Sequence, residues 1–120
     1  MFEKLRDELA RYLCPPQLLS TGDDGRAHAV AVNVSWDGDQ LLVSAGKRSL
    51  ANVAARRLLS VLWAAPSADD YSLIVDGEGV INDSGSQLQV RVTITRAVLH
   101  RPGAAALPSA CGSDCRPLFG

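Results

Sequence analysis

The chain has 120 residues, of which 47% are hydrophobic and 21% are charged, and its formal net charge at neutral pH is -1. This length suits one domain, and this composition is that of a globular protein rather than a disordered one. Because the chain has no basic excess, we expect no nucleic-acid partner. No apolar run approaches the ~20 residues of a membrane helix, so we expect no membrane span. The first residues are charged and lack a signal-peptide core, which favours a cytoplasmic protein.

Apolar residues recur at helical spacing at the start of the chain and predict an N-terminal helix. They are Phe2, Leu5, Leu9, Tyr12 and Leu13. Pro15 and Pro16 follow them. Because proline has no amide hydrogen and disfavours a helical residue before it, this pair ends the helix.

Two Asp-Gly pairs predict tight turns between extended segments, because glycine accepts the positive φ that a two-residue turn requires. They are Asp24-Gly25 and Asp37-Gly38. The strands predicted around these turns span Gln17 to Thr21, Arg26 to Trp36, and Gln40 to Ala45.

The second of these strands has two different faces, since successive side chains of a strand point to opposite sides. The face of larger residues has His28, Val30, Val32, Val34 and Trp36. The face of small or polar residues has Ala29, Ala31, Asn33 and Ser35. This second face is either exposed to solvent or allows a flat ligand to approach the backbone closely.

A second helix is predicted from Ser49 to about Leu59, with Arg56 and Arg57 near its C-terminus, where cations complement the helix dipole. Three further strands follow it. They span Ser60 to Ala65, Tyr71 to Ile81, and a long amphipathic segment that begins at Leu88. The glycines of Asp76-Gly77-Glu78-Gly79 predict a bend or bulge inside the fifth strand.

Together these elements predict a mainly β fold with minor α content. We expect a small, six-stranded, mostly antiparallel barrel, with one helix at its N-terminus and a short helix between strands three and four. Closing the sheet in this way removes its exposed edges. The barrel domain would span residues 1–102. Residues 103–120 have no periodicity, and we expect an extended tail that packs on the body or on a partner.

The three cysteines do not suggest a disulfide framework, and free thiols are the expectation. Cys111 and Cys115 are close in sequence, and Cys14 is far from both. A zinc site would need a fourth ligand such as His100 and lacks the usual paired Cys-x-x-Cys spacing. We therefore predict no metal site.

The segment from Ser44 to Ser49 joins an apolar strand to a helix and is the strongest candidate for a binding site. The N-terminus of a helix favours an anion, and Lys47 and Arg48 add two positive charges there. Ser49 either caps the helix or donates to a phosphate oxygen. The alternative is a capped helix with two solvated cations. The segment is not a nucleotide P-loop, because Leu41 stands where that loop needs a glycine.

No set of residues is spaced like a catalytic triad or a nucleophile with its base, so the catalytic residues are unknown. His28 is most simply an ordinary strand-end residue. What the sequence supports is a phosphate anchor beside a strand face of small residues, and a cofactor bound there would supply the chemistry.

An ordered series of segments resembles the pyridoxamine 5'-phosphate oxidase-like, FMN-binding split-barrel family over roughly residues 15–100. The segments are Leu18 to Val30, Trp36-Asp37-Gly38, Leu41 to Val43, Ser49, Asn52, Arg57, Ser60 to Trp63, and Asp76 to Gly79. The resemblance implies a six-stranded split barrel that forms a homodimer, with FMN bound at the subunit interface and a small-molecule substrate.

The resemblance also implies which residues hold the cofactor. The phosphate would lie against Lys47, Arg48 and Ser49. Residues along the ring would be Val32, Asn33, Ser44 and Ala45, and Trp63 would approach it from across the interface. The chain has Lys-Arg-Ser where many relatives have Ser-Arg-Lys, and Leu59-Ser60 where a proline is usual before the fourth strand.

The function expected from this resemblance is that of an FMN-binding flavoprotein and oxidoreductase with an unknown substrate. The chain lacks the C-terminal extension of the vitamin B6 oxidases, so we do not expect that activity. One alternative is a relative that binds a deazaflavin, or haem with His28 or His100 as the axial ligand. Another is a cofactor-free dimeric protein whose tail, with Cys111 and Cys115, serves an interaction.

Overall fold

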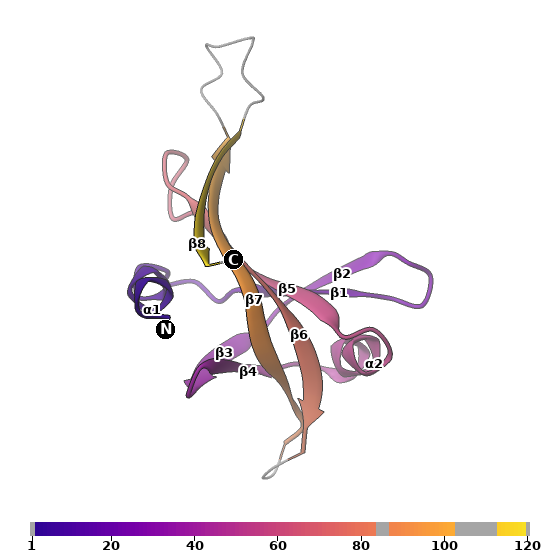
Figure 1. Cartoon of the computed structure of the whole chain (residues 1–120). Coiled ribbons are helices and arrows are strands. Elements are labelled where there is room, and N and C mark those ends of the chain that lie inside the picture. Colours follow the sequence, from indigo (N-terminus) through magenta and orange to yellow (C-terminus); the bar gives the residue numbers. More distant parts are fainter. Residues whose placement is uncertain (1, 84–86, 103–112, 120) are drawn as a thin grey trace.

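The computed structural model describes residues 2–83, 87–102 and 113–119. The fold is mainly β, with two helices beside a curled antiparallel sheet (Figure 1). In chain order the elements are α1 (Glu3–Leu9), β1 (Gln17–Thr21), β2 (Ala27–Ala31), β3 (Asn33–Asp37), β4 (Gln40–Ser44), α2 (Lys47–Ala55), β5 (Leu58–Trp63), β6 (Ser72–Asn82), β7 (Gln89–Pro102) and β8 (Ser113–Phe119). None of the helices in this described part is long and apolar enough to cross a membrane.

The sheet curls because the two strands at the ends of its pairing path are neighbours in the chain. The path runs β2-β1-β5-β6-β7-β4-β3, and every pairing in it is antiparallel. Only Val32 separates β2 from β3, and its amide donates to the carbonyl of Pro16 at 3.0 Å. One continuous extended segment therefore pairs with β1 through β2 and with β4 through β3. The sheet curls into a barrel that is split where β2 passes into β3, because these two strands do not pair with each other.

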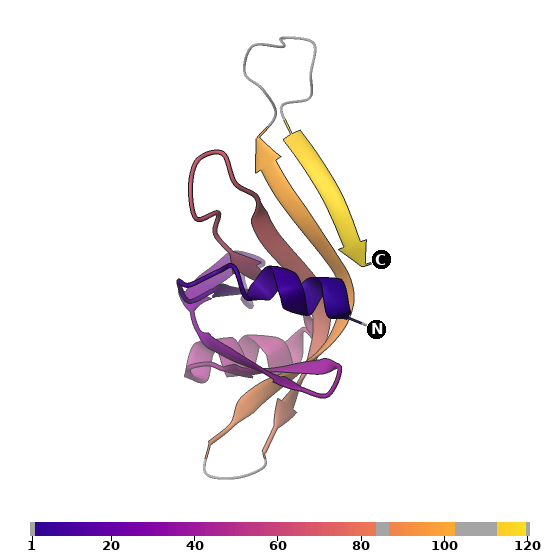
Figure 2. The ribbon, with the colours of Figure 1, turned by 90° about the vertical axis from the view of Figure 1, so that its left-hand side faces the viewer.

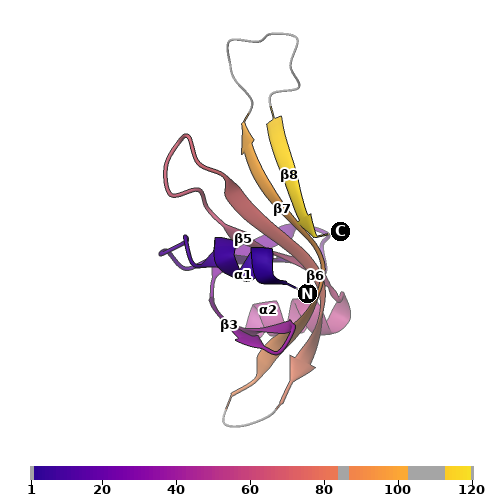
Figure 3. The same cartoon turned by 60° about the vertical axis from the view of Figure 1, so that its left-hand side comes forward.

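Two different strands pair with the same side of the long strand β7. Its first half pairs with β4, its second half pairs with β8, and β6 follows it on the other side along nearly its whole length. Helix α1 lies between β8 and the β3–β4 hairpin (Figure 2, Figure 3). The Phe2 ring packs edge-on against Phe119 of β8 at 4.8 Å between centroids, and lies 6.2 Å from Trp36 of β3. The N-terminal helix thus covers the side of the barrel between β8 and the β3–β4 hairpin, where the barrel is split (Figure 2, Figure 3).

Alternating apolar residues of the strands fill the barrel interior. The fully buried side chains include Leu18, Leu41, Val43, Val61, Leu73, Val75, Val90 and Val92. Helix α2 packs against this core through Val53, directly over Gly79 of β6. A Cβ at Gly79 would lie 2.9 Å from Cγ1 of Val53, so the close approach of helix and sheet requires glycine there.

The predicted fold class is confirmed, including the helix at the N-terminus and the short helix after the third predicted strand. The predicted second strand is divided at Val32, because its two halves pair with different neighbours. The alternation of its faces is nevertheless continuous from residue 27 to 37. The predicted irregularity in the fifth strand is also confirmed, as a register shift between Asp76 and Gly77.

The predicted bounds of the second helix were wrong at both ends. The helix begins at Lys47 and ends at Ala55, and Arg56 is already extended, with φ -137° and ψ 104°. Arg56 and Arg57 therefore lie outside the helix and do not complement its dipole from the last turn. Arg56 instead donates to the Thr21 carbonyl at 2.8 Å and pairs with Asp23 at 2.7 Å. These two interactions with the β1–β2 hairpin hold Arg56 in an extended conformation, so the helix does not continue through it.

Residues 113–119, which the sequence analysis placed in an extended tail, form strand β8 on the free half of β7. The strand shows no apolar periodicity because Cys115, Arg116 and Pro117 are all exposed, as is common for a strand at the edge of a sheet. Residues 103–112 of the expected tail, with Cys111, lie outside the described residues.

Candidate functional site

Helix α2 begins at Lys47, shortly after β4 ends at Ser44. The N-cap residue is Gly46, whose backbone is extended, and no side chain caps the helix. The first helical hydrogen bond runs from the Leu50 amide to the Gly46 carbonyl at 3.0 Å, so the amides of the preceding turn have no helical partner. Lys47 and Arg48 are exposed there, and neither forms an ion pair with another described residue. Unpaired amides and two cations make this a favourable place for an anion.

Ser49 does not cap the helix, so that half of the expectation for it was wrong. It is the third helical residue, and it is buried, with 1% of its surface exposed. The open helix end is therefore made by Gly46, Lys47 and Arg48, while Ser49 belongs to the packing beneath it.

A row of polar residues crosses the sheet beside this helix end. Asn33 of β3 lies opposite Ser44 of β4, which lies opposite Gln89 of β7. The Gln89 amide donates to the Ser44 hydroxyl at 3.1 Å. Ala45 follows Ser44 and leads into the helix. Three residues predicted to line a ring, Asn33, Ser44 and Ala45, are thus brought together next to the predicted phosphate anchor.

The other two residues predicted along the ring have their side chains in the core. Val32 and Trp63 are each 5% exposed. The Val32 amide is already used by the Pro16 carbonyl. Any contact of Val32 with a ligand on the outer face would therefore come from its remaining backbone atoms. The approach of Trp63 to a ligand across a subunit interface stays a prediction.

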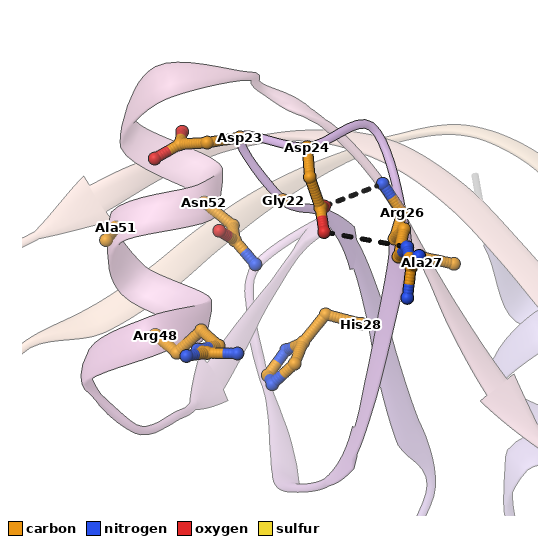
Figure 4. A pocket seen from close by; sticks show the side chains of 9 residues that line it. All are labelled: Gly22, Asp23, Asp24, Arg26, Ala27, His28, Arg48, Ala51 and Asn52. Atoms are coloured by element: carbon orange, nitrogen blue, oxygen red, sulfur yellow. Dashed lines mark hydrogen bonds and ion pairs between the residues drawn. The ribbon is translucent and has the colours of Figure 1, made fainter.

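An open pocket of about 630 Å³ lies between α2 and the β1–β2 hairpin (Figure 4). Arg48 enters it from the helix and His28 from β2, and the two side chains point toward one another across it. Two acidic residues also line it, but both are engaged: Asp23 pairs with Arg56 at 2.7 Å, and Asp24 lies 3.7 Å from the Arg26 side chain. The Arg48 and His28 side chains are therefore the titratable groups of the pocket that no described ion pair engages.

Sequence reasoning treated His28 as an ordinary strand-end residue and missed its place in this pocket. Among the residues that the structure describes, His28 Nδ1 is the one buried side-chain polar atom without a hydrogen-bond partner. Asn52, on the adjacent helix face, is satisfied by donating to the buried Ser20 hydroxyl at 3.1 Å. The available signal was periodicity, since His28 shares its strand face with the partly buried Val30.

The second histidine lies elsewhere, on the exposed β7–β8 pair. His100 Nδ1 is 3.2 Å from the Sγ atom of Cys115, directly opposite it in register. Within the described ranges, no group of three histidine, cysteine or acidic residues is arranged to hold a metal ion.

The fold is that of a split barrel, and comparison with solved structures supports this class. A solved F420 reductase superposes with a TM-score of 0.58, and the match covers 76% of this chain and 94% of that one. The two sequences are 15% identical, so the likeness concerns the fold alone. No protein-family model matches the chain.

Sequence comparison gives the family. The chain is 36% identical over 118 residues to the uncharacterized protein Mb0449c of Mycobacterium bovis, and the match covers 84% of this chain and 83% of that protein. The uncharacterized protein MT0457 of Mycobacterium tuberculosis matches with the same identity and coverage. The chain belongs to the family of these two mycobacterial proteins.

Proposed function

We propose that this protein binds a flavin or a deazaflavin and acts as an oxidoreductase on a small-molecule substrate. The observation that carries the proposal is the open N-terminus of α2, with Lys47 and Arg48 unpaired among the described residues, beside the polar row of Asn33 and Ser44. The fold shared with a solved F420 reductase supports the same class of cofactor.

In this proposal the helix end holds the cofactor phosphate. The free amides of the first turn would donate to phosphate oxygens, and Lys47 and Arg48 would add charge-assisted contacts. Ser49, being buried, would support the turn from below. The bound group would supply hydride transfer, and the residues of the chain would position it and set its electrostatic surroundings.

The ring of the cofactor would lie along the polar row. The exposed amide of Asn33 and the Ser44 hydroxyl, oriented by Gln89, provide hydrogen-bonding groups for the polar edge of a ring. Ala45 is small enough for a flat ring to approach the backbone. FMN and a deazaflavin both carry a phosphate and a flat ring, and FMN is the first ligand to test.

We further propose a homodimer with this site at the subunit interface. The outer face of the sheet carries partly exposed apolar side chains on neighbouring strands, among them Leu19 on β1 and Leu58 on β5, which is 70% exposed. Both line a shallow hollow of about 420 Å³. A second copy of the chain would remove this apolar surface from water.

FMN titration tests the anchor. We expect the double substitution Lys47→Ala and Arg48→Ala to weaken FMN binding by about tenfold or more, because two charge-assisted phosphate contacts are lost. Quenching of flavin fluorescence measures the affinity. The matched control is Lys4→Ala, which removes an exposed cation from α1 and should leave the affinity unchanged.

Two results would contradict the proposal in different ways. Equal affinities of the double variant and the unaltered protein would place the phosphate elsewhere. If mass spectrometry of the native protein, incubated with FMN and with a deazaflavin, finds neither bound, the cofactor class itself is wrong.

A further inference from the structure

We propose that a second pocket, beneath helix α1, binds a planar aromatic small molecule. We call it the α1 pocket; it has a volume of about 480 Å³, within the range of small-molecule sites. Its walls come from α1 and the segment after it, and from β3 and β5. The lining residues that carry the argument are Arg6, Tyr12, Cys14, Asn33, Trp36 and Trp63.

The chemistry of the walls favours an aromatic occupant. The chain has two tryptophans, and both line this pocket. Trp36 is partly exposed, and the guanidinium of Arg6 already stacks on its ring, 4.0 Å from the centroid. Trp63 also lines the pocket and is 5% exposed, so its indole is a fixed part of the core. Aromatic side chains attract the faces and edges of other rings beyond the effect of apolar burial alone.

The walls are held in place by contacts across the split of the barrel. The Tyr12 hydroxyl donates to the Tyr71 carbonyl at 2.8 Å, which fixes the end of the α1 segment. Arg6 donates to the Gly38 carbonyl and lies 3.9 Å from Asp39 on the β3–β4 turn. Pro15 and Pro16 stiffen the connection to β1. A pocket with such walls is preformed, so little ordering cost opposes the binding of a small rigid molecule.

The polar groups indicate the charge of the occupant. Arg6 is the charged residue that lines the pocket, and Asp39 lies beside it, so the site favours a neutral molecule. The exposed Asn33 offers one hydrogen-bonding side chain at the wall. At the rim, Leu13 is 94% exposed, the highest value among the large apolar residues described. A bound ring would cover part of this apolar surface.

Asn33 lines the α1 pocket and also belongs to the polar row proposed for the cofactor ring. An aromatic occupant would therefore lie next to that ring, which makes a neutral aromatic compound the substrate class. This placement rests on the proposed function. Binding in the α1 pocket does not, and it is tested on protein without cofactor.

The cysteines of the chain provide the test and its internal control. Cys14 and Cys115 are both free and exposed, but only Cys14 lines the α1 pocket. The probe is 2-naphthol, a neutral two-ring phenol, and alkylation by iodoacetamide is followed at each cysteine by peptide mass spectrometry. At a probe concentration ten times its Kd, we expect alkylation of Cys14 to slow by about tenfold while Cys115 is unaffected.

Decahydro-2-naphthol, the saturated counterpart of the probe, should protect Cys14 less at the same concentration. Equal protection by the two compounds would overturn the aromatic assignment, and no selective protection of Cys14 would overturn the site. Trp36→Leu should reduce the protection of Cys14 by the probe. If that variant unfolds, Leu13→Ser, a change at the exposed rim of the pocket, is tested in its place. FMN binding, measured in parallel on separate samples of the same protein, reports on the proposed function.

Discussion

Individual polar side chains at the margin of the core fix the positions of both helices. Asn52 ties α2 to β1 through the buried Ser20 hydroxyl, at 3.1 Å. Tyr12 ties the end of the α1 segment to the loop before β6 through the Tyr71 carbonyl, at 2.8 Å. The Asn52–Ser20 bond is buried, so its loss would cost more than that of the half-buried Tyr12–Tyr71 bond.

Tyr12 makes the stability of the fold depend on pH in the alkaline range. Burial, and secondarily the nearby Glu8 carboxylate, raise the pKa of Tyr12 above the ordinary value for a phenol. A raised pKa means that the folded state favours the neutral phenol. Its contribution is therefore complete below the ordinary pKa and is lost as the pH rises through the folded pKa.

We expect Tyr12→Phe to lower the free energy of unfolding by about 1 kcal/mol at pH 8, where the hydroxyl is a donor. Above pH 10 the difference between the two proteins should shrink or change sign, because the variant has no phenol to ionise. Urea unfolding of both proteins, at pH 8 and above pH 10, measures this difference in the free energy of unfolding. A difference that stays constant across the range would contradict the assignment.

At the scale of elements, α2 is held against the sheet by a glycine contact. A Cβ at Gly79 would lie 2.7 Å from side-chain carbons of Leu59 and Val90, in addition to the 2.9 Å approach to Val53. The helix can sit this close to β6 only where the strand has no side chain. The position of α2 in turn sets where Lys47 and Arg48 lie, so this contact belongs to the support of the proposed site.

Gly79→Ala should therefore lower the free energy of unfolding by about 1–3 kcal/mol, the usual range for overpacking a core. Gly46→Ala is the matched control. Gly46 has a negative φ of -79° and no atom within 4 Å of the added methyl group, so we expect little change. Urea midpoints of the two variants make the comparison. Equal destabilisation by both would show that helix packing is not responsible.

At the scale of the whole molecule, the proposed dimer can be tested at the outer face of the sheet. If the proposed dimer forms through Leu58 and its neighbours, Leu58→Glu would place a charge in a buried interface and dissociate it. We expect the mass in sedimentation equilibrium to fall from twice the 12.7 kDa of one chain to a single chain. The control Leu13→Glu alters an exposed leucine near the α1 pocket and should leave the mass unchanged. A Leu58→Glu protein that keeps the double mass would exclude this face.

The local pattern of residues determined much of the fold. The Asp-Gly pairs, the alternation from His28 to Trp36 and the apolar spacing near Leu50 are signals between near neighbours, and they correctly predicted the turns, the strand faces and the presence of α2. They also predicted a helix N-terminus close to Lys47, although the predicted start, Ser49, came too late in the sequence.

Contacts between distant residues decided the rest. Arg56 leaves the helix because the β1–β2 hairpin offers it Asp23 and the Thr21 carbonyl, and strand β8 exists because β7 is long enough to leave half an edge free. The α1 pocket likewise needs a helix, a proline turn and two tryptophans 27 residues apart in sequence to meet across the split of the barrel. Such contacts depend on the free energy of packing summed over the whole chain, so no local pattern of residues predicts them.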